Sequence, residues 1–105
     1  YFLGTDSAPH PFARKVAISG VPGIFNAPVA LATYAKVFEE EGALDKLEAF
    51  TSLNGPKHYR LPSNEDKIVL EKTPWTAPVE VKVAGPDERT LLYRGGETIE
   101  WQVVA

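Results

Sequence analysis

The chain begins with a short apolar run that ends in an acid. Tyr1 to Thr5 predicts a short buried strand, Asp6 follows it directly, and His10 lies four residues further on. Such a strand carries its polar groups to the rim of a barrel or an open sheet, and it needs other strands beside it. Because no earlier element and no methionine are present, we expect these 105 residues to be the tail of a longer protein.

Composition excludes several classes of function. The net charge is −3 without a long run of one sign, which argues against a nucleic-acid-binding tail or a basic membrane patch. Cysteine is absent, so any metal would be held by His, Asp or Glu. No apolar stretch approaches the roughly 20 residues that a membrane-spanning helix needs. We therefore expect neither nucleic acid nor a membrane as a partner.

A long loop and two helices are predicted after the first strand. Residues 7–23 are rich in Pro and Gly, and loops of this length are usually functional. Asn26 resembles an N-cap with Pro28 in the first turn, Gly42 is a C-cap candidate, and residues 54–56 are expected to end the second helix. Helical spacing predicts two inward faces, which are Ala30, Tyr34, Val37 and Phe38, and then Leu44, Leu47, Phe50 and Leu53 over 43–53.

The composition changes after Leu61. Short antiparallel strands are predicted over 68–71, 79–83, 90–93 and 98–104, separated by Pro and Gly, including Gly85-Pro86. Val79, Val81 and Val83 alternate with charged residues, as in a half-exposed strand. We therefore predict an α/β fold in two parts. Residues 1–61 would be a last βα unit with an active-site loop, and residues 62–105 a β-rich extension.

Several residues of the first part could carry chemistry. Asp6 could ligate a metal or take a proton, and the alternative is an Asx turn that leaves the strand. His10 stands between two prolines that restrict its backbone; it could bind an anion or a metal, or be an exposed loop residue without a role. Arg14 and Lys15 could steer an anion, or they could be solvated charges or pair with an acid of the missing part. Gly20–Gly23 could bring backbone close to a ligand or form a turn before the helix.

A series of motifs in the same order resembles dihydroorotases of the single-domain bacterial and fungal type. The motifs are Leu3-Gly4-Thr5-Asp6-Ser7-Ala8-Pro9-His10, Gly23-Ile24-Phe25-Asn26-Ala27-Pro28, Val37-Phe38-Glu39-Glu40, Asn54-Gly55-Pro56 with Tyr59, and Gly96-Glu97-Thr98 with Trp101. The resemblance covers nearly the whole chain and is weakest between Ser63 and Leu92. It implies a (β/α)8 TIM-type barrel, of which this chain would be the C-terminal part: the last strand, the terminal helices and a C-terminal extension.

The resemblance also implies a reaction and roles for residues. The family hydrolyses the ring amide of dihydroorotate reversibly to N-carbamoyl-aspartate in pyrimidine synthesis, with a binuclear zinc site. Asp6 matches the aspartate that would bind one zinc ion and act as general base, then as acid toward the ring nitrogen. His10 matches a histidine that helps hold the substrate carboxylate. Pro22 stands where alanine is common, so only its carbonyl could contact the ring amide, and Gly23 could share this contact.

The remaining zinc ligands implied by the resemblance, histidines and a carboxylated lysine, lie outside this chain. Asp6 alone cannot hold two zinc ions, so we expect the chain to be inactive without the N-terminal part of the same enzyme. The resemblance further implies a cytoplasmic homodimer. The alternative is a non-enzymatic module, either separately folding or degenerate, that binds a partner and no substrate.

Overall fold

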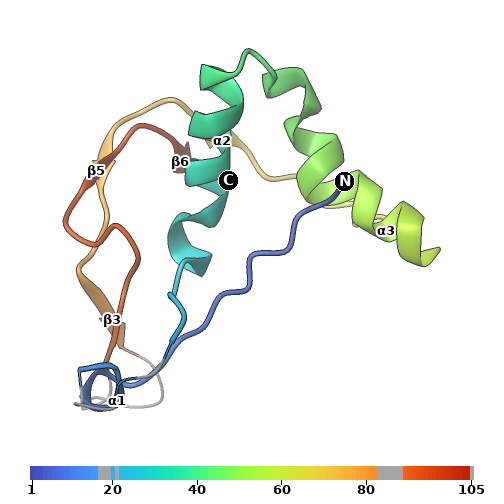
Figure 1. Cartoon of the computed structure of the whole chain (residues 1–105). Helices are drawn as coiled ribbons and strands as arrows, with labels where there is room; N and C mark the ends of the chain where they lie inside the picture. Colours follow the sequence, from blue (N-terminus) through green and yellow to red (C-terminus); the bar gives the residue numbers. More distant parts are fainter. Residues whose placement is uncertain (17–19, 21, 83–88, 105) are drawn as a thin grey trace.

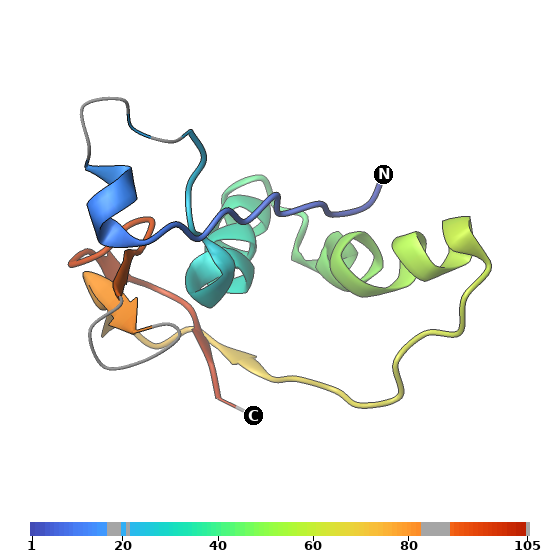
Figure 2. The same cartoon turned by 90° about the horizontal axis from the view of Figure 1, so that it is seen from below.

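The computed structural model describes residues 1–16, 20, 22–82 and 89–104, without the side chain of Arg14 (Figure 1). The helical elements are α1 (Phe12–Lys15), η1 (Ala27–Val29), α2 (Ala30–Glu40), η2 (Leu44–Lys46), the π-helical η3 (Ala49–Leu53) and α3 (Asn54–Tyr59). The strands are β1 (Leu70–Glu71), β2 (Trp75–Thr76), β3 (Glu80–Lys82), β4 (Arg89–Leu91), β5 (Thr98–Ile99) and β6 (Gln102–Val103). The N-terminal segment runs along one side of the helices, and the chain after α3 returns along the other (Figure 2).

The strand predicted over Tyr1–Thr5 does not form, and its first residue is fully exposed. The segment instead lies against the helices: Leu3 N donates to Phe50 O at 3.0 Å, and Asn54 Nδ2 donates to Tyr1 O at 2.9 Å. A strand requires a second strand along its edge, and none of the described residues supplies one. The expectation of a buried strand is therefore wrong for this chain by itself.

The second predicted helix is longer and more exposed than expected. Gly42 has φ +66°, which confirms the predicted end of α2. Leu44 and Leu53, predicted to face inward, are 39% and 40% exposed. Residues 54–56 do not end the helix, because Pro56 lies in the first turn of α3, where its missing N–H costs no hydrogen bond. The widened π-helical turn of η3 precedes it, and the helix ends instead at Arg60, with φ +57°.

The second half of the chain forms three two-stranded antiparallel pairs, β1–β6, β2–β5 and β3–β4. The predicted alternation is confirmed in β3, where Val81 is half-buried between two exposed charged residues, but it is wrong at Val79, which is 58% exposed. Strand β2 was not predicted, because two prolines flank this short segment. The predicted strand over 98–104 is interrupted between β5 and β6. Val83 and the turn at Gly85-Pro86 lie outside the described residues.

The core joins α2 to these strand pairs. Its buried members come from η1 and α2 and from the second half of the chain: Val29, Ala32, Ala77, Leu92 and Ile99. The buried side of α2 is therefore an alanine face, and Val37, predicted to point inward, is 46% exposed. Tyr34 and Phe38 pack instead on Phe50, with ring centroids 5.8 and 5.3 Å apart. Periodicity alone did not separate these two faces, since apolar residues occupy both.

An ion pair ties the end of α2 to the segment between β1 and β2. Lys72 Nζ lies 2.8 Å from Glu39 Oε2. This hydrogen bond holds the pKa of the Glu39 carboxyl below its ordinary value and raises the pKa of the Lys72 ammonium. Both groups are open to solvent, so the pair adds little to the free energy of folding. Its effect is to link the end of α2 to the segment between β1 and β2.

The chain leaves more surface exposed than a closed domain of its size. Its accessible surface is 7500 Å², whereas a compact 11.5 kDa monomer exposes about 5800 Å². Its radius of gyration is 15.6 Å, against about 13 Å for a compact domain of 100 residues. Tyr1, Phe2, Leu53, Tyr59 and Leu61 are among the large apolar residues left exposed. The molecule therefore presents apolar faces that its own residues do not cover. Among the described helices, none is both long and apolar enough to cross a membrane.

Candidate functional site

Asp6 lies at an unusual point of the backbone. Its φ is +48°, the left-handed region that few residues other than glycine adopt, although aspartate tolerates it better than most. The residue is exposed, and its carboxylate makes no hydrogen bond or ion pair with the described part of the chain. No side-chain contact with the described residues therefore fixes its direction, and the backbone on either side sets where its Cα–Cβ bond points. An unpaired, accessible carboxylate is suited to a ligand or a proton-transfer role, and no Asx turn is formed.

Both neighbours of Asp6 are bound to the start of the α2 segment. Ser7 Oγ accepts hydrogen bonds from the backbone N–H groups of Asn26 and Ala27, each at 3.2 Å, and Asn26 Nδ2 donates to Thr5 O at 3.2 Å. Asn26 is the N-cap residue of η1, as predicted, but its own side chain makes no capping hydrogen bond. Ser7 caps the turn from 19 residues upstream, which leaves the Asn26 amide to hold the N-terminal segment. A local sequence pattern could not reveal this hydrogen bond, because Ser7 and Asn26 are 19 residues apart, and Ser7 was not predicted as a site residue.

The loop closes directly beside Asp6. Ala8 N donates to Ile24 O at 2.8 Å, so that the chain at Ala8 lies beside the chain at Ile24. Gly23 has φ +101°, and a Cβ atom at this position would lie 2.7 Å from the Cβ of Ala8. The structure thus brings the Asp6–His10 segment close to Pro22 and Gly23. Only glycine fits at position 23 without moving one of the two segments.

The loop helix α1, which follows His10, is held by the β-rich half. His10 is half-buried, and α1 begins two residues after it. The guanidinium of Arg89, from β4, lies 4.0 Å from the ring centroid of Phe12 and is paired at 3.5 Å with Glu80. Tyr93 N also donates to Phe25 O at 2.8 Å, at the other end of the loop. The C-terminal extension therefore contacts both ends of the loop that carries the candidate site.

The loop backbone at Pro22 and Gly23 is exposed. Gly23 O accepts a hydrogen bond from Lys15 Nζ, so this lysine contacts the loop rather than standing alone in solvent. The Pro22 carbonyl has no hydrogen bond to the described residues. Pro22 therefore has the more available of the two backbone acceptors. The predicted anion-steering role of Arg14 falls on a side chain outside the described part of the structure.

The described residues do not hold a metal by themselves. No group of three or more His, Cys, Asp or Glu side chains gathers anywhere in the described ranges. The unpaired carboxylate of Asp6 nevertheless fits the part of one oxygen ligand in a site completed by other residues, since zinc accepts Asp oxygen beside His nitrogen.

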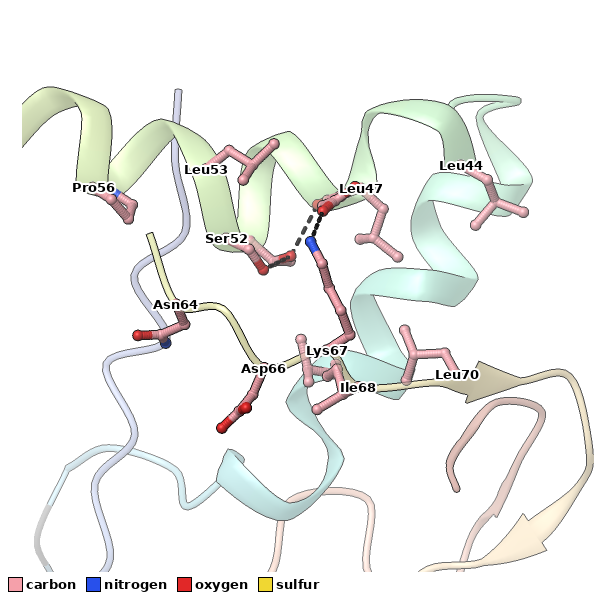
Figure 3. Close-up of a pocket in the computed structure, with 13 residues that line it drawn as sticks. Leu44, Leu47, Ser52, Leu53, Pro56, Asn64, Asp66, Lys67, Ile68 and Leu70 are labelled. Atoms are coloured by element: carbon pink, nitrogen blue, oxygen red, sulfur yellow. Dashed lines mark hydrogen bonds and ion pairs between the residues drawn. The ribbon is translucent and has the colours of Figure 1, made fainter. Parts of the chain in front are cut away.

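A separate hollow of about 680 Å³ lies between η2, η3 and the segment that follows α3 (Figure 3). Leu44, Leu47 and Leu53 line one side and Ile68 and Leu70 the other, while Lys67 reaches across to Glu48 at 3.1 Å. None of the predicted site residues lines this hollow. The candidate site predicted from the sequence therefore lies on the loop surface around Asp6, apart from this hollow.

Comparison with known proteins identifies the family. No family model matches the chain. It is 52% identical over 104 residues to a dihydroorotase of Erwinia tasmaniensis, covering 99% of the chain and 30% of that relative, and 54% identical over 102 residues to a mitochondrial dihydroorotase of Arabidopsis thaliana, covering 97% of the chain and 26% of that protein.

Solved structures agree with these relatives. The chain matches Saccharomyces cerevisiae dihydroorotase in complex with 5-fluoroorotic acid, with a TM-score of 0.88, 33% identity and coverage of 98% of this chain and 29% of that one. Dihydroorotase of Campylobacter jejuni matches with a TM-score of 0.78, 32% identity and coverage of 99% and 29%. These relatives and solved structures all belong to one class of enzyme, the dihydroorotases. It belongs to the dihydroorotase family, corresponds to a C-terminal portion, and spans about 30% of the length of the Erwinia relative.

The contact between Gly23 and Ala8 gives a direct test of the loop geometry. We expect Gly23→Ala to lower the free energy of unfolding by about 1–3 kcal/mol, because the new Cβ meets Ala8 and the positive φ becomes strained. Gly4→Ala is the matched control: nothing lies within 4 Å of its Cβ position, so its effect should stay within about 0.5 kcal/mol. Denaturant unfolding of both variants measures the difference, and equal stabilities would contradict the close packing.

Proposed function

We propose that the protein containing this chain is a dihydroorotase that reversibly hydrolyses the ring amide of dihydroorotate to N-carbamoyl-aspartate in pyrimidine synthesis. The observation that carries the proposal is the identity of about half of the residues, along almost the whole chain, with proteins named dihydroorotase. In this proposal Tyr1–Thr5 completes a (β/α)8 barrel as its last strand. The segment pairs with no strand among the described residues, which supports that placement, since a neighbouring strand from the rest of the protein would pair along its edge.

Asp6 would be this chain's reactive group. Zinc, when bound, lowers the pKa of water toward 7 and so supplies a nucleophile at neutral pH. The Asp6 carboxylate would be one zinc ligand, with histidines and a carboxylated lysine from outside the chain. It would also take a proton during attack and deliver it to the ring nitrogen as the amide bond breaks. Its exposure and its lack of another partner support this assignment.

Substrate binding would fall to the loop that follows. His10 would donate a hydrogen bond to the substrate carboxylate, and the Pro22 carbonyl would accept one from the ring amide. Gly23 already accepts from Lys15, which leaves its N–H to contribute. The hydrogen bond between Ala8 and Ile24 holds together the two segments that carry these groups. Together they would orient the ring toward Asp6.

The proposed partner is the N-terminal part of the same enzyme, and the complete protein would be a cytoplasmic homodimer. The excess accessible surface and the exposed apolar residues near the N-terminus support a partner of this kind. The same observations disfavour a separately folding, non-enzymatic module, because such a module would close its own core.

Asp6→Asn tests the proton-transfer role in the complete protein. We expect turnover of dihydroorotate to fall by about 10² or more, because the amide cannot act as a base, while most of the zinc stays bound through the other ligands. Asp45→Asn, at an exposed position in η2, is the matched control and should leave turnover unchanged. Steady-state rates and metal analysis measure both effects. Near-normal turnover of Asp6→Asn would remove Asp6 from the mechanism.

His10→Ala tests the binding role. We expect a loss of about 1.5–3 kcal/mol in transition-state stabilisation, typical of a hydrogen bond to a charged group, with much of it appearing in KM. The zinc content should be unchanged, since His10 is proposed to contact substrate and not metal. His58→Ala is the control: this exposed histidine packs against Phe2 and Tyr59, away from the loop. Loss of zinc from His10→Ala would make it a metal ligand instead.

A further inference from the structure

We propose that Asn26 is a positioning residue that sets the direction of the Asp6 carboxylate. This inference rests on the proposed dihydroorotase function. Asp6 forms no side-chain bond to the described residues, so its own contacts do not orient it. Its backbone is left-handed, with φ +48°, a conformation that costs free energy and persists only where the surroundings impose it. The residues on either side of Asp6 must therefore be held from elsewhere.

Asn26 holds both of these neighbours. Its side-chain Nδ2 donates to the carbonyl of Thr5 at 3.2 Å, which fixes the peptide plane entering Asp6. Its backbone N–H donates to Ser7 Oγ at 3.2 Å, on the residue that leaves Asp6. One residue thus grips the chain immediately before and after the candidate catalytic group. Since both flanking residues are fixed, the Cα–Cβ bond of Asp6 has one direction.

Asn26 lies next to the buried core of the described structure. Asn26 precedes η1, whose Val29 is fully buried in the core. A metal ligand is held in its precise position by further residues that are themselves fixed by packing. The loss of such a supporting residue typically costs 10–100-fold in metal affinity or activity. The other oxygen of the amide, Asn26 Oδ1, is buried without a hydrogen-bond partner in the described residues. Within the described residues, the Asn26 side chain therefore holds the segment before Asp6 through its Nδ2 donor.

The chain offers a close control for this residue. Asn54 makes the same kind of bond to the same segment: its Nδ2 donates to the Tyr1 carbonyl at 2.9 Å, four residues before Thr5. Replacing either asparagine by aspartate keeps the size of the side chain, removes the donor and sets two oxygens against each other. The two variants differ in which end of the segment they release. A general loosening of the segment would affect both, whereas a positioning effect on Asp6 belongs to position 26.

The experiment uses the complete protein and compares Asn26→Asp with Asn54→Asp. We expect Asn26→Asp to lower kcat for dihydroorotate by about 10-fold or more, with KM within about 3-fold, because a misdirected carboxylate impairs the reaction more than binding. It should also lose zinc to a competing chelator at about 10-fold lower chelator concentration than the wild type. Asn54→Asp should keep wild-type kcat and zinc retention.

Wild-type kcat and zinc retention in Asn26→Asp would overturn the inference, and so would equal losses in both variants. If Asn26→Asp does not fold, Ser7→Ala replaces it, since this change releases the other neighbour of Asp6 and leaves the Asn26 amide in place. The same losses are then expected, and their absence in folded Ser7→Ala overturns the inference. A wild-type protein with no turnover of dihydroorotate would instead refute the proposed function.

Discussion

The described structure depends on the packing of η1 and α2 against the strand pairs. Val29 and Ala32 are almost completely buried against Ile99 and Leu92. Small alanine side chains let the helix approach the strands closely, which suits pairs of only two or three residues that could not be stable alone. This contact joins the two halves of the chain. It also fixes the residues just before the helix, and through Asn26 the N-terminal segment.

The site follows from that anchor. The Ser7 hydroxyl caps the start of the helix, and the Asn26 side chain binds the carbonyl of Thr5 instead. The same two residues therefore cap the helix and hold the segment that carries Asp6. The β3–β4 pair then supports the far side of the loop through Arg89 and Phe12. Much of the remaining apolar surface stays open, as expected for a portion of a larger protein whose other elements complete its core.

Local features were predictable from the sequence, and long-range ones were not. Gly42 at the end of α2 and the alternation around Val81 depend on neighbouring residues and were predicted correctly. The strand over Tyr1–Thr5 depends on partners that the described residues lack. The role of Asn26 depends on Ser7, 19 residues away, which no local spacing reveals. For the site, spacing left Asp6 and His10 with alternatives, and the resemblance to dihydroorotases assigned their roles, which remain predictions.

The central claim is that this chain supplies Asp6 and its loop to a dihydroorotase active site. The most direct test replaces the matching segment of the Erwinia tasmaniensis dihydroorotase, 52% identical, with these 105 residues and measures hydrolysis of dihydroorotate by the purified chimera. The parent relative is the positive control, and circular dichroism with gel filtration establishes that the chimera is folded. The account predicts turnover by the chimera. A folded chimera that binds zinc as the parent does but has no turnover would contradict it.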